Sequence, residues 1–179
     1  NDARRQRQMC IRDRIKIGSD IDGEAASDYS GNSVALSSDG SVVAIGATNN
    51  DATGSNSGHV RIYQNINGNW TQIGSDINGE AEYDYSGRSV SLSADGSVVA
   101  IGAHGNDGNG SHSGHVRIYQ NNNGTWTQIG SDIDGEAEYD FSGSSVSLSA
   151  DGSVVAIGTR GNCLLYTSPS PRDHQPARV

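Results

Sequence analysis

The sequence predicts an all-β fold of tandem four-stranded antiparallel blades with a 56-residue period, which together form part of a β-propeller. Ile17–Asp20 recurs as Ile73–Asp76 and as Ile129–Asp132, a spacing of 56 residues both times. Residues 17–72 and 73–128 align without a gap and are identical at 43 of 56 positions. A period of this size indicates a solenoid, a propeller or another repeat array. Glycine makes up 24 of 179 residues, which argues against a helical bundle because each interior glycine destabilises a helix.

Each period is expected to contain four short strands. In the second copy they cover 89–93, 97–103, 115–120 and 125–130. The strand over 97–103 is almost continuously apolar, as expected for a strand buried on both faces, whereas its two neighbours alternate. Asp95-Gly96 and Asn123-Gly124 are dipeptides that favour tight hairpin turns. A β-solenoid is the alternative, although its coils are usually shorter and lack such hairpins.

The two ends of the chain differ in composition from the interior. Residues 15–162 hold all 24 glycines and carry 5 basic and 18 acidic residues, although the whole chain has a net charge of −9. Arg4–Arg14 and Cys163–Asp173 resemble translations of the two opposite arms of a transposase-type sequencing adapter. We therefore expect disorder over 1–14 and 163–179 and exclude both segments from the fold. The repeats are then 17–72, 73–128 and the partial copy 129–161 of a longer protein, whose further blades and any signal peptide lie outside this chain.

The repeat motifs resemble FG-GAP repeats, the blades of integrin-α-like propellers. Tyr85–Val90 and Phe141–Val146 are similar to that family's F-G-x-S-V with one residue inserted. Ile101–Ala103 is similar to its V-G-A-P without the proline, and Gly114–Tyr119 to its G-x-V-Y-V-Y strand. The family often has a calcium loop between the first two strands of a blade. Here only the short hairpin Ser93–Ser97 remains, so the resemblance does not extend to that metal site.

A different acidic segment in each repeat is a candidate for calcium. In 131–141 a carboxylate stands at every second position from 132 to 140, and a glycine interrupts the run. Ca²⁺ takes six to eight oxygen ligands, so such a segment can wrap around the ion, and a solvated acidic connector is the alternative. The candidate ligands are Asp132, Asp134, Glu136, Glu138 and Asp140, with Asp76, Glu80, Glu82 and Asp84 in the preceding repeat.

Strand parity predicts that the two long polar segments of a repeat converge on one edge of the blade, opposite the hairpin turns. These segments are 103–113 and 131–141. Loops on a rigid scaffold commonly carry binding, so this edge is the expected ligand face.

The remaining histidines and aromatic residues are assigned to structure. His104 and His112 correspond to Thr48 and Asn56 in the first copy, which argues against a repeated zinc site made of His104, His112 and His115. The aromatic side chains are expected to pack at blade junctions rather than to bind ligands; they are Trp70, Trp126, Tyr83, Tyr85 and Phe141.

Composition and motifs limit the possible functions. A net charge of −9 argues against a nucleic-acid partner, and no apolar run is long enough to span a membrane. No nucleophile stands beside a base at a recurring position, so the protein is predicted not to be an enzyme. We expect part of an extracellular or cell-surface propeller, a scaffold for binding or adhesion whose acidic loop face takes a protein or glycan ligand. The alternatives are a carbohydrate-binding propeller and an accessory propeller domain of a larger secreted enzyme. Open sheet edges also predict self-association.

Overall fold

In the computed structural model, residues 15–161 and 166–169 are described, and they form 13 strands and no helix. Accordingly, no described helix is long and apolar enough to cross a membrane. The predictions of disorder for 1–14, 163–165 and 170–179 lie outside the described residues.

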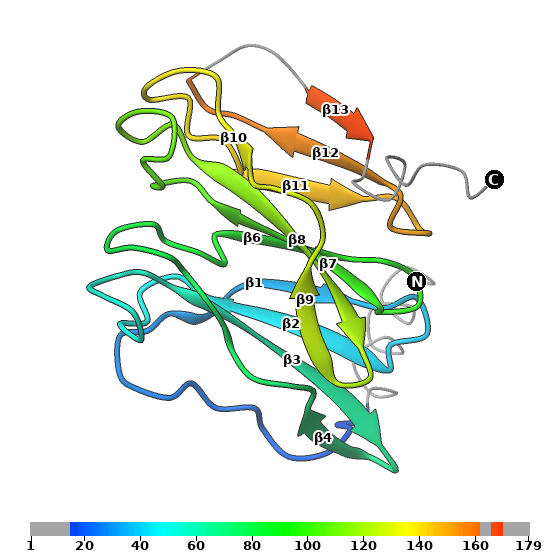
Figure 1. Cartoon of the computed structure of the whole chain (residues 1–179). Coiled ribbons are helices and arrows are strands. Elements are labelled where there is room, and N and C mark those ends of the chain that lie inside the picture. The colour runs from blue at the N-terminus through cyan, green and yellow to red at the C-terminus, as the bar shows by residue number, and fades with distance from the viewer. Residues whose placement is uncertain (1–14, 162–165, 170–179) are drawn as a thin grey trace, which may run out of the picture.

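Three antiparallel sheets follow one another along the chain and stack face to face (Figure 1). The first sheet contains β1 (Ser30–Leu36), β2 (Val42–Ala47), β3 (His59–Ile66), β4 (Asn69–Gln72) and β5 (Ile77–Asn78). The second contains β6 (Ser89–Leu92), β7 (Val98–Ala103), β8 (His115–Asn122), β9 (Thr125–Gln128) and β10 (Ile133–Asp134). The third contains β11 (Ser145–Leu148), β12 (Val154–Gly158) and β13 (Tyr166–Pro169).

The sheet topology confirms the four-stranded antiparallel blade. In the second sheet, β6, β7, β8 and β9 pair in chain order, and every pair is antiparallel. A β-solenoid stacks parallel strands, so this pairing excludes the alternative. The sequence did not predict the two-residue strand β10, which pairs with β8 beyond the end of β9. Through β10, the start of one repeat completes the sheet of the repeat before it.

An aspartate closes each hairpin between the first two strands of a blade. The carboxylate of Asp95 accepts hydrogen bonds from Ser93 Oγ at 2.6 Å and from the backbone N–H of Ser97 at 3.0 Å. These bonds lower the pKa of Asp95, and equivalent bonds lower the pKa of Asp39 and Asp151 to about 2. The carboxylate therefore holds the turn, as an Asx turn does.

The core lies in the two spaces between the sheets, and β7 contributes to both. Val99 and Ile101 pack toward the first sheet, whereas Val98 and Ala100 pack toward the third. This arrangement confirms the strand buried on both faces. Gly102 brings the sheets close together, because a Cβ there would overlap the backbone oxygen of Gly143.

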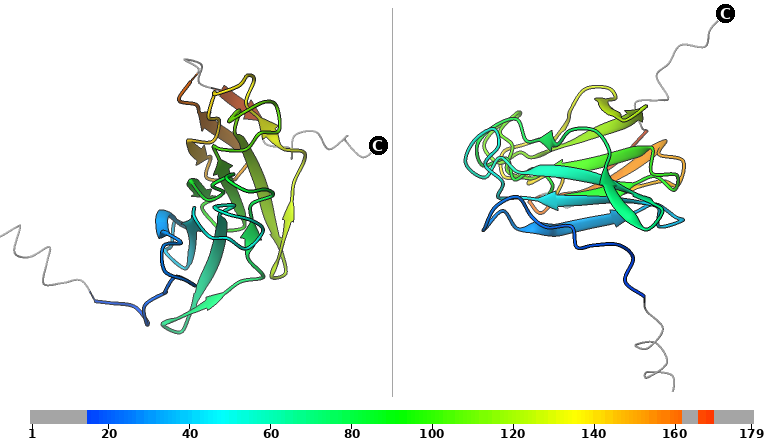
Figure 2. Two further views of the ribbon diagram at one scale, coloured as in Figure 1. Left: turned by 90° about the vertical axis from the view of Figure 1, so that its left-hand side faces the viewer. Right: turned by 90° about the horizontal axis from the view of Figure 1, so that it is seen from below.

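The two outer sheets expose apolar side chains that the middle sheet buries. Leu36 of β1 is 61% exposed, whereas its counterpart Leu92 of β6 is 9% exposed. At the other end, Val154 is exposed and its counterpart Val98 is buried. The left view of Figure 2 shows the first and third sheets at the two ends of the stack. The self-association expected from such surfaces stays a prediction.

Tyr166–Pro169 form β13, which pairs with β12 along four residues. This pairing covers the row of backbone N–H and C=O groups that β12 would otherwise leave unpaired at the sheet edge. The disorder expected for the ends of the chain stays a prediction.

Candidate functional site

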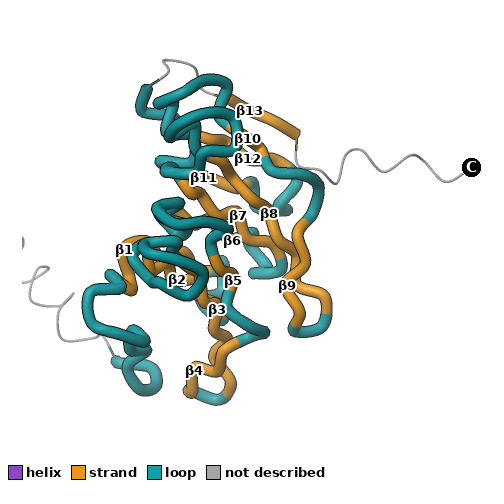
Figure 3. The backbone as a smooth tube through the Cα atoms, turned by 60° about the vertical axis from the view of Figure 1, so that its left-hand side comes forward, coloured by secondary structure: helices purple, strands orange, loops and turns teal. Residues whose placement is uncertain are grey.

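The long segments of each repeat converge on one edge of the stacked sheets, which we call the loop edge (residues 48–58, 79–88, 104–114 and 135–144). The Asn109 side chain donates to the Gly135 carbonyl at 2.8 Å, and Tyr139 N–H donates to the Ser111 carbonyl at 2.8 Å. The hairpin turns lie at the opposite edge, as Figures 1 and 3 show. The convergence predicted from strand parity is therefore confirmed.

A buried aspartate–asparagine pair holds two loops together at each junction. Asp84 accepts hydrogen bonds from the side-chain amide of Asn106 at 3.2 Å and from Ala81 N–H at 3.0 Å. Asp28 accepts the equivalent bond from Asn50 at 2.9 Å. Asp84 is only 2% exposed, so these bonds replace water for a carboxylate that burial would otherwise destabilise.

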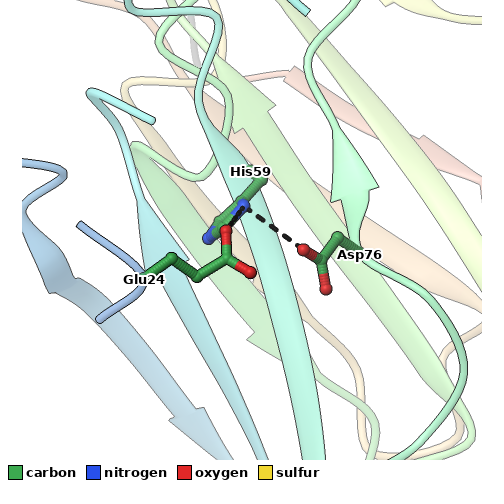
Figure 4. A group of neighbouring side chains, drawn as sticks. All are labelled: Glu24, His59 and Asp76. Atoms are coloured by element: carbon green, nitrogen blue, oxygen red, sulfur yellow. Dashed lines mark ion pairs between the residues drawn. The ribbon is translucent and has the colours of Figure 1, made fainter. Parts of the chain in front are cut away.

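Beside each pair lies a recurring group of one histidine and two carboxylates. The first cluster is Glu24, His59 and Asp76, drawn in Figure 4. Each residue comes from a different segment: the linker before β1, the start of β3, and the linker between β4 and β5. His59 Nδ1 lies 3.7 Å from Glu24 Oε2 and 3.7 Å from Asp76 Oδ2. The second cluster is Glu80, His115 and Asp132, in which His115 Nδ1 lies 3.6 Å from Asp132 Oδ2.

The carboxylates of both clusters are oriented by neighbouring side chains. Arg117 Nη1 lies 3.1 Å from Glu80 Oε1, and Arg61 Nη1 lies 3.7 Å from Glu24 Oε1. The Arg117 guanidinium is itself fixed by a 2.8 Å bond to the Asn78 carbonyl.

Two glutamine side chains orient the aspartates of the clusters. Gln72 donates to Asp76 Oδ1 at 2.6 Å, and Gln128 donates to Asp132 Oδ1 at 2.6 Å. In each aspartate, one oxygen is held by an amide and the other faces the imidazole.

Burial keeps both imidazoles neutral. Removal from water lowers the pKa of His59 and of His115, and the adjacent arginine lowers it further, against the raising effect of the carboxylates. Each cluster therefore combines a neutral imidazole, two carboxylates and one guanidinium, which leaves an excess negative charge. This donor set is able to hold a divalent cation.

The structure divides the predicted calcium ligands among several environments. Asp76, Glu80 and Asp132 lie in the two clusters, and Asp134 Oδ1 lies 4.0 Å from His115 Nδ1. Asp84 and Asp140 instead accept backbone hydrogen bonds within their own loops. Glu82 and Glu138 lie over glycines of the preceding loop, Gly54 and Gly110. Glu136 is the counterpart of Glu80 in the third repeat. The carboxylates of one segment thus do not gather around one point, and calcium binding there stays a prediction.

The two histidines of the clusters were not predicted as ligands, because the calcium prediction rested on runs of carboxylates within one segment. His59 and His115 occupy equivalent repeat positions, as do Glu24 and Glu80. This recurrence is the signal that could have found them. A zinc site with His115 was excluded only because His104 and His112, its assumed partners, do not recur.

Tyr83 is exposed at the loop edge, contrary to the expectation that it packs at a blade junction, and its counterpart Tyr139 is exposed likewise. Tyr85 and Phe141 are half-buried. Tyr83 is 51% exposed and Tyr139 is 55% exposed, because both lie at the tips of linkers rather than on strands. Both have left-handed backbones, with φ of 63° and 61°. His112 stacks on Tyr139 with ring centroids 5.9 Å apart.

The two tryptophans behave differently. Trp126 Nε1 donates to the Ile73 carbonyl at 2.9 Å, and Trp70 Nε1 donates to the Ile17 carbonyl at 3.1 Å. Trp126 also packs against the first core cluster, in agreement with the expected packing role.

Two clefts open between the loops. One, of about 290 Å³, is lined by Tyr29, Asn32, Thr48, Asn49, Tyr85, Arg88 and His104. The other, of about 300 Å³, is lined by Ala26, Ser27, Asp28, Asn49, Asp51, Ser55, Asn56 and Tyr83. Aromatic rings and amides therefore border both hollows, and carboxylates border the second one.

Two segments of the chain match a known repeat family. Residues 20–63 and 78–119 match the family model of the FG-GAP repeat. These two segments are FG-GAP repeats. The first match begins in the linker before β1 and the second begins in β5. Both end in the third strand of a blade, 56 residues apart at residues 63 and 119, so the FG-GAP unit and the structural blade have the same period. No curated protein matches the chain in sequence.

Solved structures confirm a propeller-like fold for these FG-GAP repeats. The periplasmic gluconolactonase of Pseudomonas aeruginosa is 15% identical with a TM-score of 0.56, over 84% of this chain and 41% of that one. A candidate 6-phosphogluconolactonase of Bacteroides uniformis is 14% identical with a TM-score of 0.53, over 76% and 35%. The hydrazine synthase of Kuenenia stuttgartiensis is 13% identical with a TM-score of 0.51, over 89% and 37%. The chain spans well under half the length of these proteins.

The prediction that this protein is not an enzyme is corrected by these neighbours. Structures of the same fold include a gluconolactonase, so the lack of a recurring nucleophile–base pair does not exclude catalysis. At this level of identity the likeness shows the fold alone and transfers no activity.

Proposed function

We propose that the loop edge of this FG-GAP repeat chain binds an extracellular glycan. The observation that carries the proposal is the exposure of Tyr83 and Tyr139 at equivalent positions of consecutive repeats. Residues other than glycine rarely adopt a left-handed backbone, which costs on the order of 1–3 kcal/mol and is retained where the surroundings or a function require it. Here it presents two rings to solvent, and the Tyr83 ring borders one of the clefts.

The chemistry around these rings suits a sugar. An aromatic face packs against the apolar C–H face of a pyranose, while amides and carboxylates exchange hydrogen bonds with its hydroxyl groups. Asn56 and Asp51 border the cleft that Tyr83 also lines. The net negative charge of residues 15–162 favours a neutral or basic glycan over an acidic one.

Two further expectations remain proposals. An extracellular location accords with the FG-GAP family and with the chain's acidic, lysine-poor composition. A role as an accessory propeller domain of a larger secreted enzyme is compatible with the same binding face.

The test is a glycan array probed with the full chain. The double variant Tyr83→Ala/Tyr139→Ala should lose at least ten-fold in signal, whereas Thr125→Ala, an exposed change at the opposite edge, should bind as the parent does. Retained binding by the tyrosine variant, or no binding of any glycan by the parent chain, would overturn the proposal. In the second case, binding of a protein at the same edge would replace it.

A further inference from the structure

Each imidazole of the two Glu–His–Asp clusters has one buried ring nitrogen without a hydrogen-bond partner. It is Nδ1, which faces the carboxylates, in His59, and Nε2 in His115. His59 is 1% exposed, and its Nδ1 has no hydrogen-bond partner. Two carboxylate oxygens stand 3.7 Å from this nitrogen, beyond hydrogen-bond range. A buried polar atom without a hydrogen bond is costly, and here the acceptors lie beside His59 Nδ1 without bonding to it.

These separations suit ligands that share an ion. Donors about 2.1 Å from a tetrahedral Zn²⁺ lie about 3.4 Å from one another. The imidazole–carboxylate distances are 3.7 Å in the first cluster and 3.6 Å between His115 and Asp132 in the second. The candidate ligand atoms in each cluster all lie within 4.8 Å of one another.

We propose that each of the two clusters binds one divalent transition-metal ion, with Zn²⁺ as the representative metal. Calcium prefers oxygen ligands only, so a buried imidazole at the centre of the cluster selects against it. This inference does not depend on glycan binding, because the clusters and the exposed tyrosines are separate sets of residues.

The side chains around the clusters hold the candidate ligands in fixed orientations. Arg61 and Arg117 contact the glutamate oxygens Oε1, and Gln72 and Gln128 hold the aspartate oxygens Oδ1. In metal sites, such outer contacts fix the orientation of the ligands and typically change affinity 10- to 100-fold. In the first cluster, Glu24 Oε2 also accepts a 3.3 Å bond from Asn50, and the oxygen keeps a second lone pair for a metal.

A fourth ligand is available from the short strands β5 and β10. Asn78 lies opposite His59 in the β3–β5 ladder, and its Oδ1 has no hydrogen-bond partner. Asp134 occupies the same place opposite His115. Each metal would then join the linker of one repeat to the sheet of the repeat before it.

The experiment is a titration of the full chain with Co²⁺, whose visible absorption is intense when it is four-coordinate, followed by displacement with Zn²⁺. Because thiols bind both metals, it uses a background in which Cys10 and Cys163 are replaced by Ser. We expect two ions per chain, one after His59→Gln or His115→Gln, and none after both changes. Gln72→Ala should weaken one site about ten-fold. His112→Gln, which alters a histidine outside the clusters, should keep two ions.

Several results would overturn the inference. They are no Co²⁺ absorption, binding that survives the double histidine variant, and binding of Ca²⁺ alone. If either histidine variant fails to give the parent circular dichroism spectrum, Glu24→Gln and Asp132→Asn replace them. Each of these should remove one ion and leave the other.

Discussion

Asn106 donates its side-chain amide to Asp84, and both side chains are buried at the junction of two loops. The same relationship joins Asn50 to Asp28 one repeat earlier. The FG-GAP repeat therefore carries, at each junction, a polar pair that fixes the loops on which the candidate sites lie.

Asp84→Ala is expected to lower the free energy of unfolding by about 3 kcal/mol. The change leaves the Asn106 amide and the Ala81 N–H without their acceptor in a buried place. Urea unfolding of the variant and the parent measures the difference. Glu82→Ala, which removes an exposed carboxylate of the same linker, should change it by less than about 0.5 kcal/mol. Equal stability of the two variants would refute the structural role of Asp84.

Leu92→Ala is expected to cost about 2–4 kcal/mol, because the side chain fills the space between the first and second sheets. Leu36→Ala removes the same side chain at the equivalent position of β1, where it is exposed, and should cost less than about 1 kcal/mol. Equilibrium unfolding in denaturant gives both values. Similar losses in the two variants would mean that the sheets do not stack in the order described.

Leu36→Lys combined with Val154→Lys is expected to reduce self-association. These residues lie on the apolar outer faces of the first and third sheets, which correspond to faces that contact one another inside the stack. Sedimentation velocity over a range of concentrations measures the effect. A parent chain that is already a single monomeric species at all concentrations would contradict the prediction.

His104 is expected to make the protein less stable as the pH falls from about 6.5 toward 4. Burial, together with Arg88, Arg160 and His112, lowers the pKa of His104 to about 4. Between these pH values the unfolded chain therefore binds a proton that the folded chain does not, which lowers the free energy of unfolding. The stability that depends on a neutral His104 is complete above pH 6.5 and is lost as the pH falls toward 4.

The variant His104→Thr tests this effect, because Thr48 occupies the position in the first repeat. The free energies of unfolding at pH 7 and at pH 4.5 should differ by about 1 kcal/mol less in the variant than in the parent. This figure allows for solvent screening of the partly exposed ring. An unchanged difference would show that other groups carry the pH dependence.

The blade architecture was predictable because the repeat multiplies each local signal. Asp95-Gly96 and Asn123-Gly124 mark hairpins, and the apolar run over 98–103 marks the central strand; both occur where the structure has them. The convergence of the loops followed from strand parity alone. Strand β10 was not predictable in this way, because two residues carry no periodicity.

The candidate metal clusters depend on contacts between segments that are far apart in sequence. Glu80 and His115 meet Asp132 only after the linker of the third repeat crosses the sheet of the second. A search for ligands within one segment cannot find such a group, whereas comparison of repeats shows that each member recurs. The exposure of Tyr83 was not predictable either, because the sequence does not indicate a left-handed backbone at a residue other than Gly or Asn.

Metal binding by the two clusters is tested by anomalous X-ray scattering from crystals of the chain grown with Zn²⁺, measured on both sides of the zinc absorption edge. We predict two peaks, one between Glu24, His59 and Asp76 and one between Glu80, His115 and Asp132. Peaks only at other residues, or no peak at either cluster, would contradict it.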